Sequence, residues 1–352
     1  MNKKVAEFIA TTLRVKILIT GTAGFIGFHL AKSFIEKGIE VIGVDNVNDY
    51  YDVNLKFARL NETGIDASKI EERAMMQSTK YPNYRFVKMD ISNKDDVLSL
   101  FADERPDYVC NMAAQAGVRF SLTNPDIYIQ SNVSGFLNIL EACRFYPVKH
   151  LLYASSSSVY GLNQEQPFTT VQKTDRPISV YAATKKMNEL LAHSYSHLYK
   201  IYTTGLRFFT VYGPWGRPDM APIIFAKSII ERTPIQIYND GKMYRDFTYI
   251  DDIVQSIVLL FNRQITDNDD KLYRIYNIGN SRSVCLMDFI ETLEKKLGIN
   301  AIKEFLPLQQ GDMISTLADV SELEHRIGYC PNTSMEEGIS KFIDWYIKNK
   351  TL

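Results

Sequence analysis

The 352-residue sequence has no excess of charge of either sign, because 40 Lys and Arg residues stand against 41 Asp and Glu residues. A formal net charge of -1 gives no field that would draw the chain to a polyanion, so we expect neither nucleic acid nor a membrane as a partner. No apolar run reaches the ~18 residues that a transmembrane helix needs. Hydrophobic residues still make up 45% of the chain, which is enough for the core of a large globular protein.

Cysteine is also scarce, and the four residues lie far apart: Cys110, Cys143, Cys285 and Cys330. They form no C-x-x-C pair and have no suitably spaced histidine, so we predict no metal site. Cysteines in apolar or helical contexts are typical of buried free thiols in a reducing compartment. We therefore expect a cytoplasmic protein.

Residues 1–14 are an N-terminal extension in which two lysines precede apolar residues, a pattern that weakly resembles a signal peptide. Glu7 and Arg14 interrupt the apolar run, and its apolar residues recur at helical spacing. The pattern favours a short amphipathic helix packed on the body of the protein over a membrane anchor.

Short β-rich runs alternate with helical patterns in the first half of the chain, which is typical of a parallel sheet covered by helices. The runs are apolar nearly throughout, as expected when both faces of a sheet are buried. The predicted fold class is α/β, a Rossmann-type doubly wound parallel sheet. Strands are predicted over 16–20, 40–45, 84–90, 107–114, 150–155 and 202–207, helices over 25–37, 94–102, 126–145 and 181–199, and a loop-rich insertion over 61–82.

Beyond about residue 207 the pattern becomes irregular, with shorter elements and several prolines. This change indicates a smaller C-terminal domain that shares the chain with the first. We expect the large domain to take 15–207 and about 248–275, and the small domain to take about 208–247 and 276–352.

A glycine-rich turn follows the first predicted strand, where TGTAGFIGFHL places Gly21, Gly24 and Gly27. A strand, such a turn and a helix let the backbone approach a pyrophosphate at the helix N-terminus, although the same glycines could serve only a tight turn. Asp45 favours the dinucleotide, because it ends the second predicted strand near the ~20-residue spacing of an acid that binds the adenosine ribose. A carboxylate there would repel a 2′-phosphate, so NAD is favoured over NADP.

Two further features suit a bound dinucleotide. Asp90 and Ile91 follow the third predicted strand, at the position of the adenine edge, and the AAQAG stretch over 113–117 offers small residues against a cofactor. Asp90 could instead cap the next helix, and the alanines could be ordinary core packing.

A candidate catalytic pair lies in YAATK, where Tyr181 and Lys185 stand one turn apart on the same helix face. A tyrosine of reference pKa ~10 is a poor base at neutral pH, and a nearby ammonium favours its phenolate. The Y-x-x-x-K pattern is common on amphipathic helices, and its place after a nucleotide site is what favours catalysis here.

Four consecutive serines, over 155–158, end the strand before this helix. They form no G-x-S-x-G motif and have no acid and histidine in a recognisable order, which argues against a hydrolase. Ligands bind outside the carboxyl ends of strands in open α/β sheets, so Ser156 is placed to hydrogen-bond a reacting oxygen beside Tyr181.

SSVYG, YAATK and LRFFTVYGPWGRPDMA, together with the glycine turn and Asp45, resemble the extended short-chain dehydrogenase/reductases that act on nucleotide sugars. The resemblance runs from about residue 15 to the end of the chain, and it implies that the smaller C-terminal domain is the substrate-binding domain. GFIGFHL, VDNVNDYYDVNLK and FFTVYGPWGRPDMA are most similar to the UDP-glucuronate 4-epimerase family. That family implies NAD-dependent 4-epimerisation of UDP-glucuronate to UDP-galacturonate through a transient 4-keto sugar, and a homodimer formed by the helices near 126–145 and 181–199.

The resemblance also implies the residues of the site. Tyr181, Lys185 and Ser156 would be catalytic, Arg245 would clamp the diphosphate and Asp312 would bind the uridine ribose, although Gln310 stands where the family usually has proline. The implied cofactor residues are Gly21, Gly24, Phe25, Ile26, Gly27, Asp45, Asn46, Asp90, Ile91, Ala113, Ala114, Asn132, Tyr181, Lys185 and Phe208. The implied substrate residues are Arg119, Ser156, Ser157, Thr210, Arg217, Arg245 and Asp312.

Several alternatives share this fold or this chemistry. Related dehydratases carry Asp-Glu where this chain has Ser157 and Ser158, and UDP-glucuronate decarboxylases usually carry glutamate in place of Ser158. A 4-epimerase of UDP-glucose or UDP-N-acetylglucosamine commonly has asparagine in place of Thr210. A non-catalytic NAD-sensing protein would usually have lost the Tyr181 and Lys185 pair. Arg217 could also be a surface charge in a Pro/Gly loop.

Overall fold

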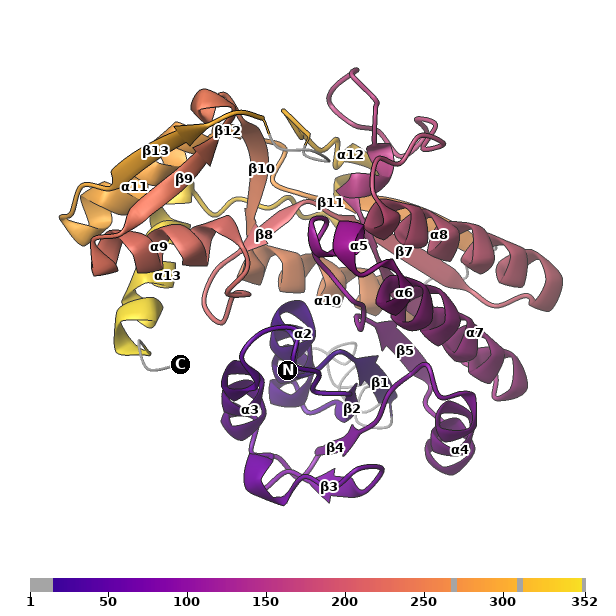
Figure 1. The fold of residues 1–352 in the computed structure, drawn as a ribbon. Coiled ribbons are helices and arrows are strands. Elements are labelled where there is room, and N and C mark those ends of the chain that lie inside the picture. The colour runs from indigo at the N-terminus through magenta and orange to yellow at the C-terminus, as the bar shows by residue number, and fades with distance from the viewer. Residues whose placement is uncertain (1–14, 267–270, 309–312, 350–352) are drawn as a thin grey trace, which may run out of the picture.

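An eight-stranded sheet forms the centre of the structure (Figure 1). The structure is a computed structural model that describes residues 15–266, 271–308 and 313–349. The strands are β1 (Lys16–Thr20), β2 (Glu40–Asp45), β3 (Met75–Gln77), β4 (Tyr84–Lys88), β5 (Tyr108–Asn111), β6 (His150–Ser156), β7 (Thr203–Phe208) and β11 (Tyr273–Ile278). Their order is β11-β7-β6-β5-β1-β2-β4-β3, and only β3 runs antiparallel to its neighbour. The direction of winding reverses beside β1, which is where such sheets bind ligands.

Helices cover both faces of this sheet, because their apolar stripes pack on strands that are buried on both sides. On one face, Phe34 of α2 (Phe25–Glu36) packs against Phe261 of α10 (Ile250–Thr266), with ring centroids 5.0 Å apart. On the other face lie α4 (Lys94–Glu104), α7 (Gly135–Phe145) and α8 (Val180–Tyr199). The predicted doubly wound α/β sheet is confirmed.

A second group of elements lies beside the carboxyl ends of the large sheet, in orange and yellow in Figure 1. Its strands are β8 (Thr210–Tyr212), β10 (Tyr244–Tyr249) and β12 (Ser283–Cys285) in one sheet, and β9 (Pro234–Tyr238) and β13 (Ile302–Leu306) in another. Its helices are α9 (Ala221–Glu231), α11 (Leu286–Leu297) and α13 (Met335–Lys348), whereas α12 (Ser321–Ile327) packs against α10 and β11 of the large sheet. The rings of Phe247 and Phe289, stacked 4.4 Å apart, hold β10 against α11.

The six predicted strands of the large sheet are all present, with ends that shift by a few residues. The strand predicted over 107–114 stops at Asn111, because the chain beyond it leaves the sheet and passes against the glycine turn. The helix predicted over 126–145 is divided into α6 (Pro125–Tyr128), a π-helical stretch η2 (Ile129–Ser134) and α7. Shorter elements are α5 (Phe120–Thr123) and the 3-10 turns η1 (Ala67–Lys69), η3 (Ser157–Tyr160) and η4 (Asn239–Gly241).

Helix α3 (Val53–Glu62) is one of several helices that were not predicted from the sequence. Asp52 caps it by accepting from the backbone N–H of Asn54 at 2.9 Å. Its buried side chains include Lys56 and Arg59 as well as leucines, so the apolar period that identifies a helix is weak. The predicted helix over 1–14 lies outside the described residues. Within the described part of the chain, no helix is long and apolar enough to cross a membrane.

Candidate active site

A cavity of about 400 Å³ lies where the carboxyl ends of the large-sheet strands face β8 and β10. The predicted catalytic residues Tyr181, Lys185 and Ser156 all line it. So do the predicted cofactor residues Gly21, Gly24, Phe25, Ile26, Gly27, Asp45, Asn46, Asp90, Ile91, Ala113, Ala114 and Phe208, and the predicted substrate residues Ser157, Thr210, Arg217 and Arg245. Residues widely separated in the sequence therefore meet around one cavity.

The glycine turn brings bare backbone to the edge of the cavity. Gly21 has a φ of +79°, and a Cβ on it would stand 2.8 Å from the backbone nitrogen of Ala113. A Cβ on Gly27 would stand 2.1 Å from the carbonyl oxygen of Gly21. Helix α2 begins directly after the turn, and its N-cap, Gly24, has no side chain to cap the free N–H groups. This close-packed turn leaves those N–H groups for an anionic ligand, as a dinucleotide pyrophosphate requires.

Asp45 is the last residue of β2, and Asp90 follows the neighbouring strand β4; both line the cavity. The carboxylate of Asp45 accepts from the backbone N–H groups of Ala23 at 3.0 Å and Val47 at 2.8 Å, which fixes its orientation. Burial alone would raise the pKa of Asp90, but hydrogen bonds from Asn46 and Ser92 outweigh burial and lower it. Asp90 is therefore a carboxylate at neutral pH. Two oriented acceptors here match the hydroxyls of an adenosine.

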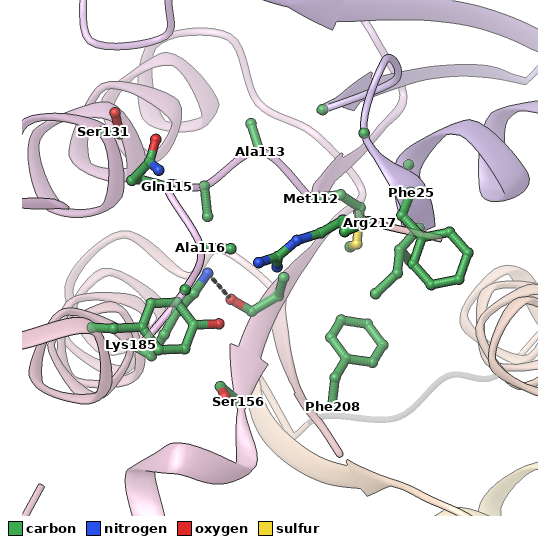
Figure 2. A pocket seen from close by; sticks show the side chains of 18 of the residues that line it. Phe25, Met112, Ala113, Gln115, Ala116, Ser131, Ser156, Lys185, Phe208 and Arg217 are labelled. Carbon is green, nitrogen blue, oxygen red and sulfur yellow. Dashed lines mark hydrogen bonds between the residues drawn. The ribbon is translucent and has the colours of Figure 1, made fainter. Parts of the chain in front are cut away.

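The first turns of α8 present Tyr181 and Lys185 to the cavity. Ser179 begins the helix, since its hydroxyl accepts from the backbone N–H of Ala182 at 3.1 Å. One turn further, the Lys185 ammonium donates to the carbonyl oxygen of Ala154 in β6 at 2.8 Å and lies 5.9 Å from the centre of the Tyr181 ring. Figure 2 shows Lys185 and Ser156 on the same side of the cavity.

Burial controls the protonation of both groups. It raises the pKa of Tyr181, while the hydrogen bond with Ser156 and the positive charge of Arg217 lower that pKa in part. Burial also lowers the pKa of Lys185 to about 7. We predicted from the sequence that the lysine favours the phenolate of Tyr181. In the protein without ligands, Arg217 supplies the positive charge that acts on Tyr181, and burial of the ring still outweighs that charge.

The serine run divides into residues with different roles. Ser155 points away from the cavity opening and donates to the buried carboxylate of Glu189 at 2.7 Å. That carboxylate also pairs with Arg207 through two contacts of 2.8 Å. Ser156 accepts from the hydroxyl of Ser158 at 2.9 Å. The Glu189–Arg207 pair thus anchors the strand end that presents Ser156 to the cavity.

Arg217 extends into the cavity from the loop after β8, toward the side where Lys185 lies (Figure 2). Its Nε donates to Asp219 at 3.0 Å, and a second, shorter contact makes the pair bidentate. Tyr50, from the loop after β2, donates to the same carboxylate at 3.0 Å. Arg217 therefore lines the cavity and is held there by Asp219, which fits the predicted role better than a simple surface charge does.

Two predicted site residues in the described part of the chain, Asn132 and Arg119, are not among those that line the cavity. Asn132 lies behind its wall, where its amide accepts from the backbone N–H of Gln115 at 2.7 Å and donates to the carbonyl oxygen of the same residue at 3.0 Å. The guanidinium of Arg119 stacks over the ring of Tyr238 at 4.9 Å. Asn132 therefore supports a segment that lines the cavity, and the roles of Asn132 and Arg119 toward a ligand stay predictions. Asp312 falls outside the described residues.

The cavity also includes residues that were not predicted individually, among them Asn48, Tyr50 and Lys56. The Lys56 ammonium is buried and donates to the backbone carbonyl and the side-chain oxygen of Asn48, both at 2.6 Å. All three belong to VDNVNDYYDVNLK, one of the motifs that support the family resemblance. No role was predicted from the sequence for these three residues. In the sequence, the only indication of Lys56 is its place in this segment, eleven residues after Asp45, because its burial is visible only in the structure. Among the described residues, no cluster of three or more His, Cys, Asp or Glu side chains could hold a metal ion.

The fold and the cavity define a class of protein: a dinucleotide-binding α/β enzyme with a Ser/Tyr/Lys trio beside the nucleotide site. The family model described as "NAD dependent epimerase/dehydratase family" matches residues 17–279, so the chain belongs to the NAD-dependent epimerase/dehydratase family. The cofactor is accordingly NAD.

Relatives and solved structures refine this comparison. The chain is 50% identical over 346 residues to the protein CapI of Staphylococcus aureus, with 95% of this chain and 99% of that one covered. It is 44% identical over 348 residues to a probable UDP-glucuronate 4-epimerase of Rhizobium meliloti, covering 95% and 98%. The crystal structure of the UDP-glucuronic acid 4-epimerase of Bacillus cereus, in complex with UDP-glucuronic acid and NAD, has a TM-score of 0.83 at 31% identity, covering 95% and 99%.

Proposed function

We propose that this protein is a UDP-glucuronate 4-epimerase that interconverts UDP-glucuronate and UDP-galacturonate. The observation that supports it best is the meeting, in one cavity, of Tyr181, Lys185 and Ser156 with Arg217 and with the uncharged pair Ser157 and Ser158. The first three can move a proton at a sugar hydroxyl, Arg217 can hold an anionic sugar, and the serines supply no acid or base for elimination. The relatives of known name point to the same substrate.

The cavity fits NAD, because the glycine turn has no room for side chains where a pyrophosphate must approach. The turn would hold the pyrophosphate, Asp45 and Asp90 the adenosine, and Lys185 the nicotinamide ribose. When bound, NAD supplies the oxidation and re-reduction of the sugar carbon C4. Asp45 selects against the additional phosphate of NADP, since two anionic groups would meet there.

Tyr181 acts as the base and then as the acid. Its phenolate takes the proton of the sugar 4-hydroxyl, and the resulting phenol returns the proton when the 4-keto sugar, turned over in the cavity, is reduced on its other face. Ser156 hydrogen-bonds the 4-oxygen and stays uncharged. Because burial raises the pKa of Tyr181, the phenolate needs positive charge nearby, which Arg217 provides and to which Lys185 would add in its ammonium form.

The sugar carboxylate has to be held while C4 is oxidised. A 4-keto glucuronate is a β-keto acid, and it loses CO₂ when its carboxylate rotates out of the ring plane. Arg217 offers a fork of donors to this carboxylate, and Ser157 and Thr210 offer hydroxyls from the same wall of the cavity. Holding the carboxylate by several donors favours epimerisation over decarboxylation.

The proposal extends to the rest of the molecule. Residues 15–207 and about 248–275 would bind NAD, while about 208–247 and 276–352 would bind the nucleotide sugar, with Arg245 on the diphosphate and Asp312 on the uridine. The protein would act in the cytoplasm, where UDP-sugars are made, and as a homodimer through η2, α7 and α8. Exposed apolar side chains on this surface support the dimer: Leu122, Ile129, Leu137, Phe145, Met187, Leu190 and Leu198.

One experiment separates the candidate functions. The purified protein is incubated with UDP-glucuronate, UDP-glucose or UDP-N-acetylglucosamine without added NAD, and the products are identified. We expect UDP-galacturonate from the first sugar only. Conversion of a neutral sugar instead would favour the alternative 4-epimerases, a UDP-pentose with CO₂ would identify a decarboxylase, and no turnover with NAD bound would favour an NAD sensor.

A further inference from the structure

Arg59 in α3 is a buried cation whose hydrogen-bond partners, among the residues that the structure describes, are all neutral oxygens. It is 0% exposed. Its Nη1 donates to the carbonyl oxygen of Ala23 at 2.8 Å and to the hydroxyl of Tyr51 at 2.7 Å. Its Nη2 donates to the carbonyl oxygens of Trp215 at 2.7 Å and Gly216 at 3.3 Å. The guanidinium fork therefore joins three segments that are far apart in the sequence.

These contacts are costly, because a charge in a dry interior is normally neutralised by a carboxylate. Burial lowers the pKa of Arg59, and its Nε has no hydrogen-bond partner in the described part of the chain. An apolar side chain would fill this position without removing a charge from water. The cost indicates that the position needs what only a guanidinium offers, several donors in a rigid plane.

The three joined segments all belong to the active site. Ala23 lies in the glycine turn, and its N–H donates to Asp45. Trp215 and Gly216 lie in the loop that presents Arg217 to the cavity. Trp215 has a φ of +62°, a left-handed conformation that costs a non-glycine residue energy and needs support from its surroundings. Arg59 holds both carbonyls of this loop directly before Arg217 leaves it.

The adjacent residues Tyr50 and Tyr51 also link the loop after β2 to Arg217. Tyr51 accepts from Arg59, while Tyr50 donates to Asp219, which pairs with Arg217. The loop after β2 thus fixes the backbone that leads into Arg217 and also the carboxylate that orients its side chain.

We propose that Arg59 is a positioning residue that couples the cofactor turn to the sugar pocket by fixing the loop of Arg217. The inference rests on the proposed function only for the identity of the sugar. It assigns Arg59 no contact with the substrate. Its effect on the substrate passes through Arg217, and its effect on NAD passes through the carbonyl group of Ala23.

The test uses Arg59→Met and Arg59→Lys in the full-length protein, with Arg85→Met as the matched control. Arg85 is a partly buried arginine on β4 that pairs with Glu104 and Glu40 away from the cavity. We expect Arg59→Met to raise the KM for UDP-glucuronate by about tenfold, within the range for coupled neighbours, and to purify with less NAD. Arg85→Met should keep wild-type KM and NAD content.

A double-mutant comparison separates positioning from general stability. In an Arg217→Ala background, Arg59→Met should change KM by less than about twofold, because the group through which it acts is gone. An equal effect of Arg59→Met in both backgrounds, or wild-type KM and NAD content in Arg59→Met alone, would overturn the proposal. If Arg59→Met does not fold, Arg59→Lys is measured in the same way, since a lysine keeps the charge but cannot bond all three segments.

The NAD measurement needs no turnover. If the wild-type protein fails to convert UDP-glucuronate, the proposed function is wrong, but released NAD per chain still compares Arg59→Met with Arg85→Met. Equal NAD in those two variants would reject the coupling to the cofactor turn whatever the sugar is.

Discussion

The ammonium of Lys185 donates to the carbonyl oxygen of Ala154 at 2.8 Å, and this bond joins α8 to β6. Two residues after Ala154, the strand presents Ser156, and one turn before Lys185, the helix presents Tyr181. The bond therefore sets the distance between the hydroxyl and the phenol that must share one sugar oxygen. In the proposed mechanism, Lys185 would position both Ser156 and Tyr181 in addition to carrying charge.

Tyr181→Phe should abolish epimerisation while the protein still purifies with NAD. Phenylalanine keeps the ring in its place on α8 but has no proton to exchange, and loss of a general acid or base typically costs ~10²–10⁴-fold in rate. Product formation from UDP-glucuronate and released NAD are measured on the same sample. Tyr199→Phe, at the exposed end of α8, is the control and should keep wild-type activity. Activity above about a tenth of wild type in Tyr181→Phe would rule out its role as the base.

The buried ammonium of Lys185 makes stability depend on pH. Its pKa is about 7 in the folded protein and ~10.4 in an unfolded chain, so between these values the unfolded chain binds more protons. Stability must then rise with pH across this window and stay level below it, at about 1.4 kcal/mol per pH unit. In NAD-free protein, the free energy of unfolding of the wild type minus that of Lys185→Met should increase by roughly 2–3 kcal/mol from pH 7 to pH 9. A constant difference between the two proteins would contradict the low pKa.

The parts of the site that the sequence predicted are those with a fixed local pattern. Gly21, Asp45 and the pair Tyr181 and Lys185 each belong to one element, and the element determines where they point. Arg59 could not be predicted, because its four acceptors come from segments that only the folded chain brings together. For the same reason, the bonds between Asn132 and the backbone of Gln115 could not be predicted from the sequence.

The selection of NAD over NADP should depend on the charge of Asp45. Asp45→Asn keeps the size of the side chain, and its remaining carbonyl oxygen can still accept from Ala23 or Val47. Removing the negative charge should bring the affinities for the two dinucleotides closer by at least about tenfold, since a charged contact of this kind contributes ~1.5–3 kcal/mol. Dissociation constants measured on NAD-free protein check the prediction, with Asp49→Asn, an exposed neighbour, as the control. An unchanged preference would show that another residue discriminates.

The buried pair of Glu189 and Arg207 should be essential for stability. Both side chains are at most 4% exposed, and their charge-assisted hydrogen bonds, at 2.8 Å, raise the pKa of Arg207 although burial alone would lower it. Glu189→Gln leaves an uncompensated buried cation and should lower the free energy of unfolding by about 3–5 kcal/mol. Glu337→Gln breaks an exposed pair with Lys341 and should cost at most ~1 kcal/mol. Denaturant unfolding of both variants gives the comparison, and similar small losses would mean that the buried pair contributes little.

The proposed dimer makes its own prediction about exposed leucines on α8. Leu190 is 56% exposed and Leu198 is 63% exposed on α8, which packs against α7. Exposed apolar side chains that gather on one surface indicate a protein–protein interface. Leu190→Glu with Leu198→Glu would place two charges in an apolar interface and should convert the dimer to a monomer. Light scattering coupled to gel filtration should then give half the mass of the wild type. Ile347→Glu, on the distant helix α13 and 50% exposed, is the matched control and should leave the mass unchanged. A wild-type protein that already has the mass of one chain would exclude the dimer, and an unchanged mass in the double variant would place its interface elsewhere.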